Sequence, residues 1–298
     1  MKPPLHRSLV LATPWPGIFC TQLDSARHYP RHSHTTHGFG LIEQGAQRSA
    51  SGRGQVDAHA GDLITTNPGE VHDGRPLDGP TRRWRMVYLD PGVMRAMTDI
   101  DEGDVEFTRP AFDDPHLRRV VQALFDRLHA WHDGATDALA CEEALVHACG
   151  LLLERHATRT APAQVDADVS RARDRLAADL LQPPSLGELA ALTGLGKYQL
   201  LRRFAKACGV PPHAWLVQQR AEHARQLIRQ GAGLAAAAAA SGFADQSHMT
   251  RTFVRQFGFT PGVWRSAVRL QQRSRPAVPA RAECGNEHPA LRPRLRPE

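Results

Sequence analysis

The segment MTRTFVRQFGFTPGVW at residues 249–264 has a counterpart forty-nine residues earlier, LLRRFAKACGVPPHAW at residues 200–215. Arg, Phe, Gly, Pro and Trp recur in both segments at the same offsets, which indicates a structural unit that occurs twice. Upstream of each segment, a run of small and apolar residues ends at a glycine, Gly194 in the first copy and Gly242 in the second. A helix, a short glycine-containing turn and a second helix form a helix-turn-helix, which we therefore predict for both copies.

The first copy shows both helices of this unit. Ser185 followed by Glu188 forms a capping box, which predicts the start of a helix over residues 185–193. A second helix at about residues 197–207 has Leu200, Phe204 and Ala207 on its core face. The outward face consists of Tyr198, Leu201 and Arg202.

The second copy repeats this pattern. Its core face consists of Met249, Phe253 and Phe257, and its outward face of Gln246, Ser247, Thr250 and Arg251. An outward Arg can donate two hydrogen bonds to guanine and Gln can pair with adenine, whereas Ser and Thr commonly bind phosphate. The outward residues are therefore candidate DNA contacts. The alternative is a plain helical domain with solvated polar side chains.

The distribution of charge divides the chain near residue 165, ahead of the two repeated segments. Up to Val165 there are 17 Lys and Arg against 21 Asp and Glu, whereas residues 166–270 have 14 against 7. A basic domain behind an acidic one is expected when one of two domains binds a polyanion. The Pro-, Ala- and Thr-rich stretch at 157–169 predicts a linker, and the Pro- and Arg-rich residues 271–298 predict a disordered basic tail.

Residues 185–228, followed by ASGFADQSHMTRTFVRQFGFTPGVWR at 240–265, resemble the DNA-binding domain of the AraC/XylS family of transcriptional regulators. The resemblance implies two helix-turn-helix units joined by a long helix at about 213–230, with recognition helices in successive major grooves. By motif position, one groove would be contacted by Tyr198, Leu201 and Arg202, and the other by Gln246, Ser247, His248 and Arg251. The chain departs from the family at Leu201, where a polar residue is common, and at the run of alanines at 235–240.

The N-terminal part predicts strands around residues 38–44, 55–58, 62–66 and 82–90, and helices at 115–131 and 136–156. The apolar faces of the helices must pack on the strands or on a second copy of the chain. Gly45 and the segment 61–72 are similar to the two cupin motifs. We therefore expect an α+β chain of two domains: a cupin-like β-barrel with closing α-helices at 1–156, and an all-α domain with two helix-turn-helix units at 170–270.

The barrel carries a group of candidate ligand contacts, namely His32, His34, Glu43, His72, Trp84 and Tyr88. In the resembled family such a domain binds a small organic effector, so we assign these residues to effector binding. The same three histidines and Glu43 could instead hold a metal ion, since histidines and a carboxylate from neighbouring strands form such sites. Glu43 could equally pair with a neighbouring arginine, and the aromatic residues could simply pack in the core.

These patterns favour a one-component, ligand-responsive transcription factor that binds double-stranded DNA and a small-molecule effector. We expect a cytoplasmic homodimer without a membrane span, metal or cofactor, and RNA polymerase is a candidate partner. The five cysteines show no disulfide or metal-finger spacing. No catalytic triad, P-loop or dinucleotide motif indicates an enzyme. The alternatives are a metal-dependent cupin enzyme or metal sensor fused to a DNA-binding domain, and an architectural DNA binder with a vestigial barrel.

Overall fold

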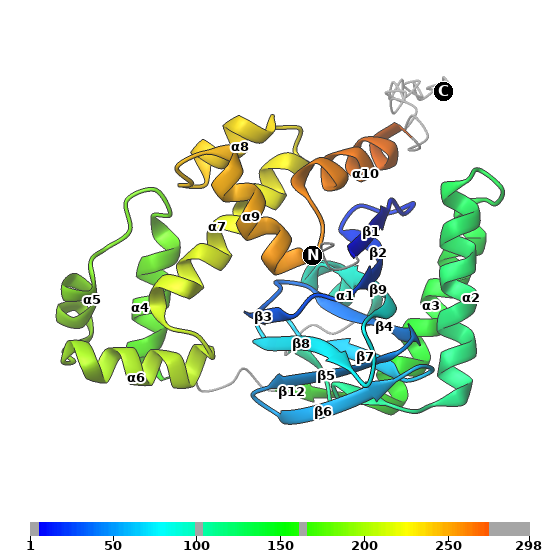
Figure 1. Ribbon diagram of the computed structural model, residues 1–298, viewed down its shortest axis with the longest axis horizontal. Coiled ribbons are helices and arrows are strands. Elements are labelled where there is room, and N and C mark those ends of the chain that lie inside the picture. Colours follow the sequence, from blue (N-terminus) through cyan, green and yellow to red (C-terminus); the bar gives the residue numbers. More distant parts are fainter. Residues whose placement is uncertain (1–5, 99–103, 161–165, 274–298) are drawn as a thin grey trace, which may run out of the picture.

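The computed structural model describes residues 6–98, 104–160 and 166–273. A β-rich N-terminal domain is followed by a helical C-terminal domain (Figure 1). The predicted α+β class with a helix-turn-helix domain is thereby confirmed. Among the described helices, none combines the length and apolar character required to cross a bilayer.

The N-terminal domain is built on two antiparallel sheets. In spatial order, the larger sheet contains β1 (His6–Leu11), β2 (Ile18–Ser25), β9 (Arg82–Leu89), β4 (His37–Gln44), β7 (Leu63–Thr66) and β11 (Ala111–Phe112). The smaller sheet contains β3 (Tyr29–His32), β8 (His72–Leu77), β5 (Ala46–Ser51) and β6 (Gly54–His59).

The two sheets face each other across an apolar layer that includes Leu23, Ile42, Trp84 and Met86. Within the described ranges, no strand of one sheet pairs with a strand of the other. The cupin-like β-rich domain that we expected therefore takes the form of an open two-sheet sandwich and not of a closed barrel. The four predicted strands correspond to β4, β6, β7 and β9.

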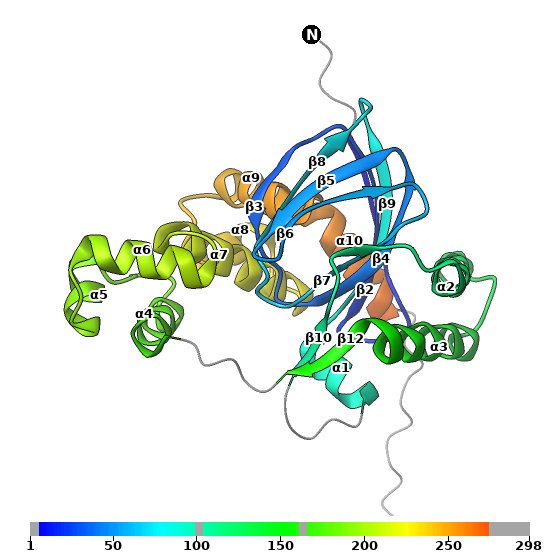
Figure 2. The same cartoon turned by 90° about the horizontal axis from the view of Figure 1, so that it is seen from below.

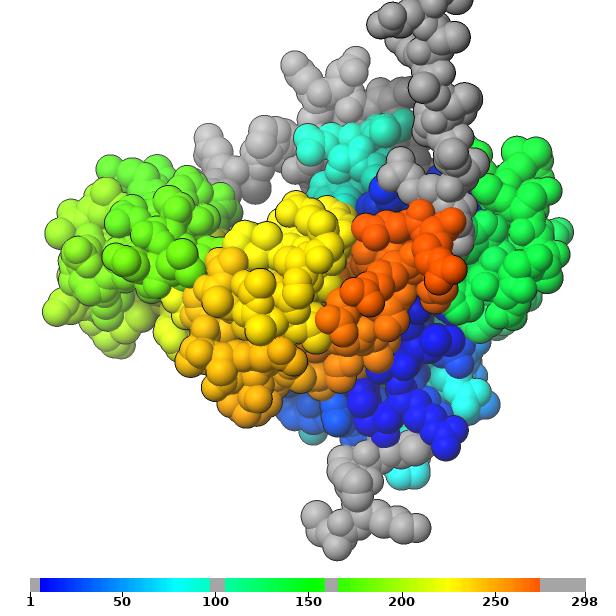
Figure 3. All heavy atoms as spheres, turned by 90° about the horizontal axis from the view of Figure 1, so that it is seen from above, coloured from blue at the N-terminus to red at the C-terminus, as the bar shows by residue number. Residues whose placement is uncertain are grey.

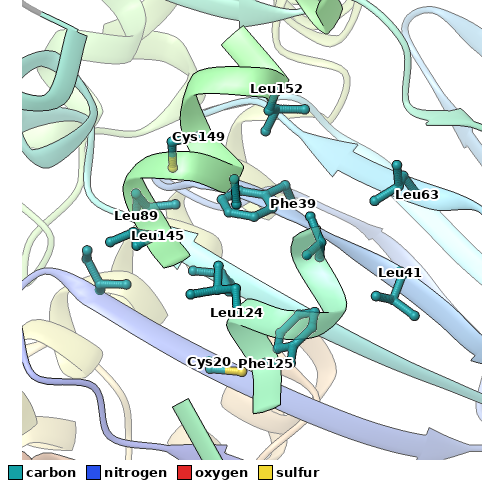
Figure 4. Close-up of a cluster of buried hydrophobic side chains, with 14 of the residues drawn as sticks. Cys20, Phe39, Leu41, Leu63, Leu89, Leu124, Phe125, Leu145, Cys149 and Leu152 are labelled. Carbon is teal, nitrogen blue, oxygen red and sulfur yellow. The ribbon is translucent and has the colours of Figure 1, made fainter. Parts of the chain in front are cut away.

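The predicted helices appear as α2 (Pro115–His132) and α3 (Ala138–His156) and cover the outer face of the larger sheet (Figure 2). Figure 4 shows this core, in which Phe39 of the sheet lies among Leu124 and Leu145 of the helices. The helices thus pack on the strands of their own chain. Leu139 and Val146 of α3 lie outside this core and are exposed.

The predicted linker at 157–169 contains ordered elements at both ends. β12 (Ala157–Thr160) pairs with β10 (Asp104–Phe107), and α4 (Ala167–Ala178) begins before the predicted linker ends. Residues 161–165 lie outside the described residues, as does the predicted tail from residue 274 onward. Residues 271–273 belong to the last helix. A short helix, α1 (Pro91–Thr98), follows β9.

The helical domain contains both predicted repeats. Its helices after α4 are α5 (Leu186–Thr193), α6 (Lys197–Cys208), α7 (Pro212–Arg229), α8 (Leu234–Ala240), α9 (Gln246–Phe257) and α10 (Pro261–Arg273). The capping box of Ser185 and Glu188 starts α5 as predicted. Gly209 and Gly258 end α6 and α9 with φ of 70° and 79°, a left-handed conformation that explains why glycine recurs at this offset.

The second half of the helical domain packs on the sandwich. Val10 and Phe19 of the larger sheet share one apolar cluster with Phe253, Phe259 and Trp264. Figure 3 shows the end of this half, α10, lying beside the first strands. The two domains are therefore joined through the second repeat.

Candidate DNA-contacting faces and an interdomain cavity

The predicted contacts of the first recognition helix lie on α6. Tyr198 is 72% exposed, and the guanidinium of the exposed Arg202 lies 5.8 Å from the centroid of its ring. Leu201 is half-buried beside them. Leu200 and Phe204 are buried as predicted, whereas Ala207, near the end of α6, is exposed.

The predicted contacts of the second recognition helix lie on α9. Gln246, Ser247 and Arg251 are exposed. His248 is half-buried, with its ring edge-on to Phe243 at 5.2 Å between centroids. The carboxylate of Asp245 accepts a hydrogen bond from the His248 backbone N–H at 2.6 Å and caps the helix. Both helices thus present an arginine and neighbouring polar side chains to solvent.

A cavity of about 70 Å³ lies between the two sheets and α9. The sandwich contributes Trp84 and Tyr88 together with three histidines, and α9 contributes Gln256 and Phe257. The ring of His34 stacks on that of Phe257, with 5.9 Å between centroids. The wall of the cavity therefore includes the second recognition helix.

The three histidines are His32 at the end of β3, His34 two residues later and His72 at the start of β8. Strands β3 and β8 pair with His32 opposite His72. One ring nitrogen from each of the three lies within 4.8 Å of the others. Burial, assisted by His72, lowers the pKa of His32 to about 3, and burial also lowers the pKa of His34 and of His72. The three rings are therefore neutral at pH 7.

Glu43 does not line this cavity. Its carboxylate lies 2.6 Å from Nε of Arg85, whose guanidinium lies 4.6 Å from the ring centroid of Phe125 in α2. Glu43 therefore belongs to the side of the sheet that faces the helices, so the structure does not bring it together with the histidines. Trp84 and Tyr88 do line the cavity, where Trp84 is 8% exposed.

Polar contacts also join the two domains. Ser33 Oγ donates to Oε1 of Gln218 in α7 at 2.9 Å, and Gln256 Nε2, from a residue that lines the cavity, donates to the Ser33 carbonyl at 3.2 Å. Outside the cavity, Arg229 of α7 donates to Asp90 at 2.7 Å. These residues were not predicted from the sequence, because each contact joins segments that are more than a hundred residues apart.

A buried ion pair lies within the same interface. Arg225 of α7 is 2% exposed and donates to Glu222 at 2.6 Å. Its guanidinium also lies 5.2 Å from the ring centroids of Phe19 and Trp264, one from each domain. The arginine therefore forms part of the contact between α7, α10 and the sandwich.

Together, a ligand-binding sandwich and paired helix-turn-helix units define a class of ligand-responsive DNA-binding regulators. Residues 16–148 match the family described as AraC-like ligand binding domain, and residues 189–267 match a helix-turn-helix domain family. The chain belongs to the AraC family of transcriptional regulators. The protein is accordingly a DNA-binding transcriptional regulator with an effector-binding N-terminal domain.

Individual relatives agree with this assignment. The uncharacterized HTH-type transcriptional regulator YbfI of Bacillus subtilis is 31% identical over 225 residues, which cover 74% of this chain and 81% of YbfI. The transcriptional activator RhaR of Klebsiella pneumoniae is 31% identical over 165 residues, covering 54% of this chain and 56% of RhaR. A crystal structure of apo ToxT from Vibrio cholerae has the same fold, with a TM-score of 0.54 at 10% identity, covering 86% of this chain and 99% of ToxT.

Proposed function

We propose that this regulator binds DNA through the exposed faces of α6 and α9 and binds its effector in the cavity between the sandwich and α9. The observation that carries this proposal is the shared wall of the cavity, in which His34 of the sandwich stacks on Phe257 of α9. An effector at this place touches the ligand-binding domain and a DNA-contacting helix at once.

The DNA-binding half of the proposal assigns Tyr198, Leu201 and Arg202 to one major groove. Gln246, Ser247, His248 and Arg251 are assigned to the next groove. Exposure of both arginines supports base contacts, since a guanidinium can donate two hydrogen bonds to a guanine edge. The basic charge of residues 166–270 supports contact with the phosphates around them.

The effector half of the proposal follows from the size of the cavity. Pockets for organic ligands usually measure ~300–1,000 Å³, whereas this cavity measures about 70 Å³. An organic effector must therefore displace Phe257 and Gln256 to enter, and such a ligand favours the arrangement in which α9 is released from the sandwich. A ligand shifts this equilibrium only by its difference in affinity for the two arrangements. His32, His34, His72, Trp84 and Tyr88 are the proposed contacts.

Selection of genomic fragments by the full-length protein tests the DNA-binding half. We expect one recurring site with two sequence elements about one helical turn, ~34 Å, apart. We also expect affinity to fall steeply with salt, because phosphate contacts release counterions. Recovery of unrelated fragments, or an affinity that is insensitive to salt, would contradict the assignment of the two faces.

The partner proposal includes a homodimer formed through α3. Leu139 and Val146 are 63% and 57% exposed and lie two helical turns apart, so they share one face that their own domain does not cover. Sedimentation of the full chain, compared with Leu139→Glu, tests it. We expect a dimer that the substitution dissociates, and a monomeric parent protein would contradict the proposal.

Regulation of transcription requires access to DNA and RNA polymerase, so we include a cytoplasmic location and a polymerase contact in the proposal. Transcription in vitro from the selected site, with purified polymerase and with or without the regulator, measures this contact. A change in transcript level that is lost when either Arg202 or Arg251 is substituted supports the proposal. An unchanged transcript level contradicts it.

A further inference from the structure

The histidines of the cavity form a group whose chemistry goes beyond contact with an organic effector. We propose that His32, His34 and His72 bind one divalent transition-metal ion of the Zn²⁺ class beside α9. Three ring nitrogens within 4.8 Å of one another supply three ligands from two paired strands and the adjoining loop. Around a tetrahedral zinc with Zn–N distances of ~2.0–2.1 Å, ligand nitrogens lie about 3.3 Å apart. Small rotations of the rings bridge this difference.

The hydrogen bonds of two rings orient them for metal binding. His32 Nδ1 lies 2.7 Å from the Pro30 carbonyl oxygen, and His72 Nδ1 lies 3.0 Å from the Glu70 carbonyl oxygen. A carbonyl oxygen can only accept, so Nδ1 carries the hydrogen in both rings and Nε2 keeps a free lone pair. Metal-binding histidines usually donate their other N–H to a carbonyl or carboxylate in this way.

The donor set determines the class of metal. Imidazole nitrogens suit Zn²⁺, Ni²⁺, Cu²⁺ and similar ions, whereas Mg²⁺ and Ca²⁺ require oxygen ligands. Glu43 is held by Arg85, and within the described part of the chain the group of converging ligand atoms consists of the three histidines. Three protein ligands leave a coordination position for water or for a ligand atom.

Gln256 of α9 contributes a buried amide oxygen to the same cavity. Its side chain is 5% exposed and lines the cavity, and its Oε1 has no hydrogen-bond partner among the residues that the structure describes. A metal-bound water can donate to this oxygen, which would satisfy a buried acceptor that is otherwise costly. A cavity of about 70 Å³ accommodates an ion and a water molecule, since water occupies ~30 Å³.

The metal would also connect the sandwich to the second recognition helix. Ligation fixes the ring of His34, which stacks on Phe257, and the bound water contacts Gln256. Both contacts require α9 to be packed on the sandwich, an arrangement that we call docked. We therefore infer that metal binding favours docking. This regulatory consequence rests on the proposed function, whereas metal binding itself does not.

Titration of tag-free, chelator-treated full-length protein with Zn²⁺ tests the site without DNA. We expect saturable binding of one equivalent, and Co²⁺ in the same site should give the visible absorption bands of tetrahedral coordination. His34→Gln and His72→Gln should each weaken binding at least tenfold. Gln256→Leu keeps all three ligands and should weaken binding by less. Circular dichroism and thermal unfolding of each variant establish that it is folded.

His59→Gln is the matched control, because the His59 side chain is 61% exposed on β6 and lies outside the cavity. It should bind Zn²⁺ like the parent protein. Absence of saturable binding, or equal weakening by His59→Gln and His34→Gln, would overturn the proposal. Neither result affects the DNA-selection experiment, so the two proposals can fail independently.

Discussion

The two helix-turn-helix units share a sequence pattern but differ in what surrounds them. The first unit packs with α4 in a cluster of its own, in which Leu200 and Phe204 are fully buried. The second unit buries Met249 and Phe253 at the equivalent positions, yet its cluster continues into Val10 and Phe19 of the sandwich. Equivalent core residues therefore stabilise a local unit in one case and a joint between domains in the other.

The difference indicates which unit receives a signal from the N-terminal domain. The cavity and the buried hydrogen bonds of Gln256 and Gln218 all involve α9 or α7. By contrast, α6 meets the sandwich near its end, where Val71 lies against Gly209. A change in the cavity should therefore alter the second unit first and reach the first unit through α7.

Truncating the core phenylalanine of each unit gives the largest expected effect. Phe204→Ala and Phe253→Ala should each lower the free energy of unfolding by ~3–5 kcal/mol, because each leaves a cavity in a closed core. Hydrogen exchange should differ between them. Phe204→Ala should increase exchange in α5 and α6, whereas Phe253→Ala should increase it in α9, α10 and the strands β1 and β2. The same pattern of exchange in both variants would contradict the comparison.

The repeated units could be predicted because their signals are local. Capping residues, the glycines after each helix and the spacing of core residues all lie within one segment of fifty residues or fewer. The four predicted strands were found for the same reason, since short apolar runs bounded by Gly and Pro are also local signals. The strands β3 and β8 were missed because they are short, interrupted by polar residues and partly exposed.

The candidate site was only partly predictable. The spacing of His32, His34 and His72 pointed to one site, and the structure places the three together. Glu43 was predicted to belong to the same site but lies apart from it, since sequence does not show which face of β4 meets Arg85. The contribution of Gln256 and Phe257 depends on how α9 docks, which is decided by packing between distant segments.

Removal of the outward arginines compares the units on DNA. Arg202→Ala and Arg251→Ala should each weaken binding to the selected site by ~1–3 kcal/mol, because each removes a proposed base contact. Fluorescence anisotropy on the selected site and on random DNA measures the difference. Arg48→Ala is a suitable control, as this residue pairs with Asp57 at 2.6 Å in the sandwich. An equal loss of affinity for the selected site and for random DNA would indicate that the arginines contact phosphates and not bases.

Removal of one hydroxyl should loosen the second unit specifically. Ser33→Ala leaves Gln218 Oε1 without its donor in a buried interface, which costs ~1–3 kcal/mol. Denaturant unfolding and hydrogen exchange should show weaker docking of α7 and α9, with α5 and α6 unaffected. Ser170→Ala is the control, because its hydroxyl lies on the exposed surface of α4 and should have little effect. Unchanged exchange in α7 would show that the hydrogen bond does not hold the domains together.

The smallest expected effect concerns the cap of the first unit. Ser185 Oγ accepts from the Glu188 N–H at 3.2 Å, and the Glu188 carboxylate accepts from the Ser185 N–H at 2.7 Å. Ser185→Ala should cost ~1 kcal/mol, seen as faster exchange in α5 while α9 keeps the parent rate. Faster exchange in both helices would mean that the units do not behave separately.

The pH dependence of the stability that the Ser185–Glu188 cap gives to α5 tests the role of this cap independently. Hydrogen bonds from Ser185 lower the pKa of Glu188 below its ordinary value of 4.5. Because the folded pKa is the lower one, the stabilisation is present above the unfolded pKa and is lost as the pH falls through the folded value. After division by the intrinsic chemical rate at each pH, the protection of α5 against exchange should therefore begin to fall only below about pH 4.5, and Glu188→Gln should reduce this dependence. If Glu188→Gln keeps the full acid response of α5, another carboxylate must control this helix, and the cap would not distinguish the two units.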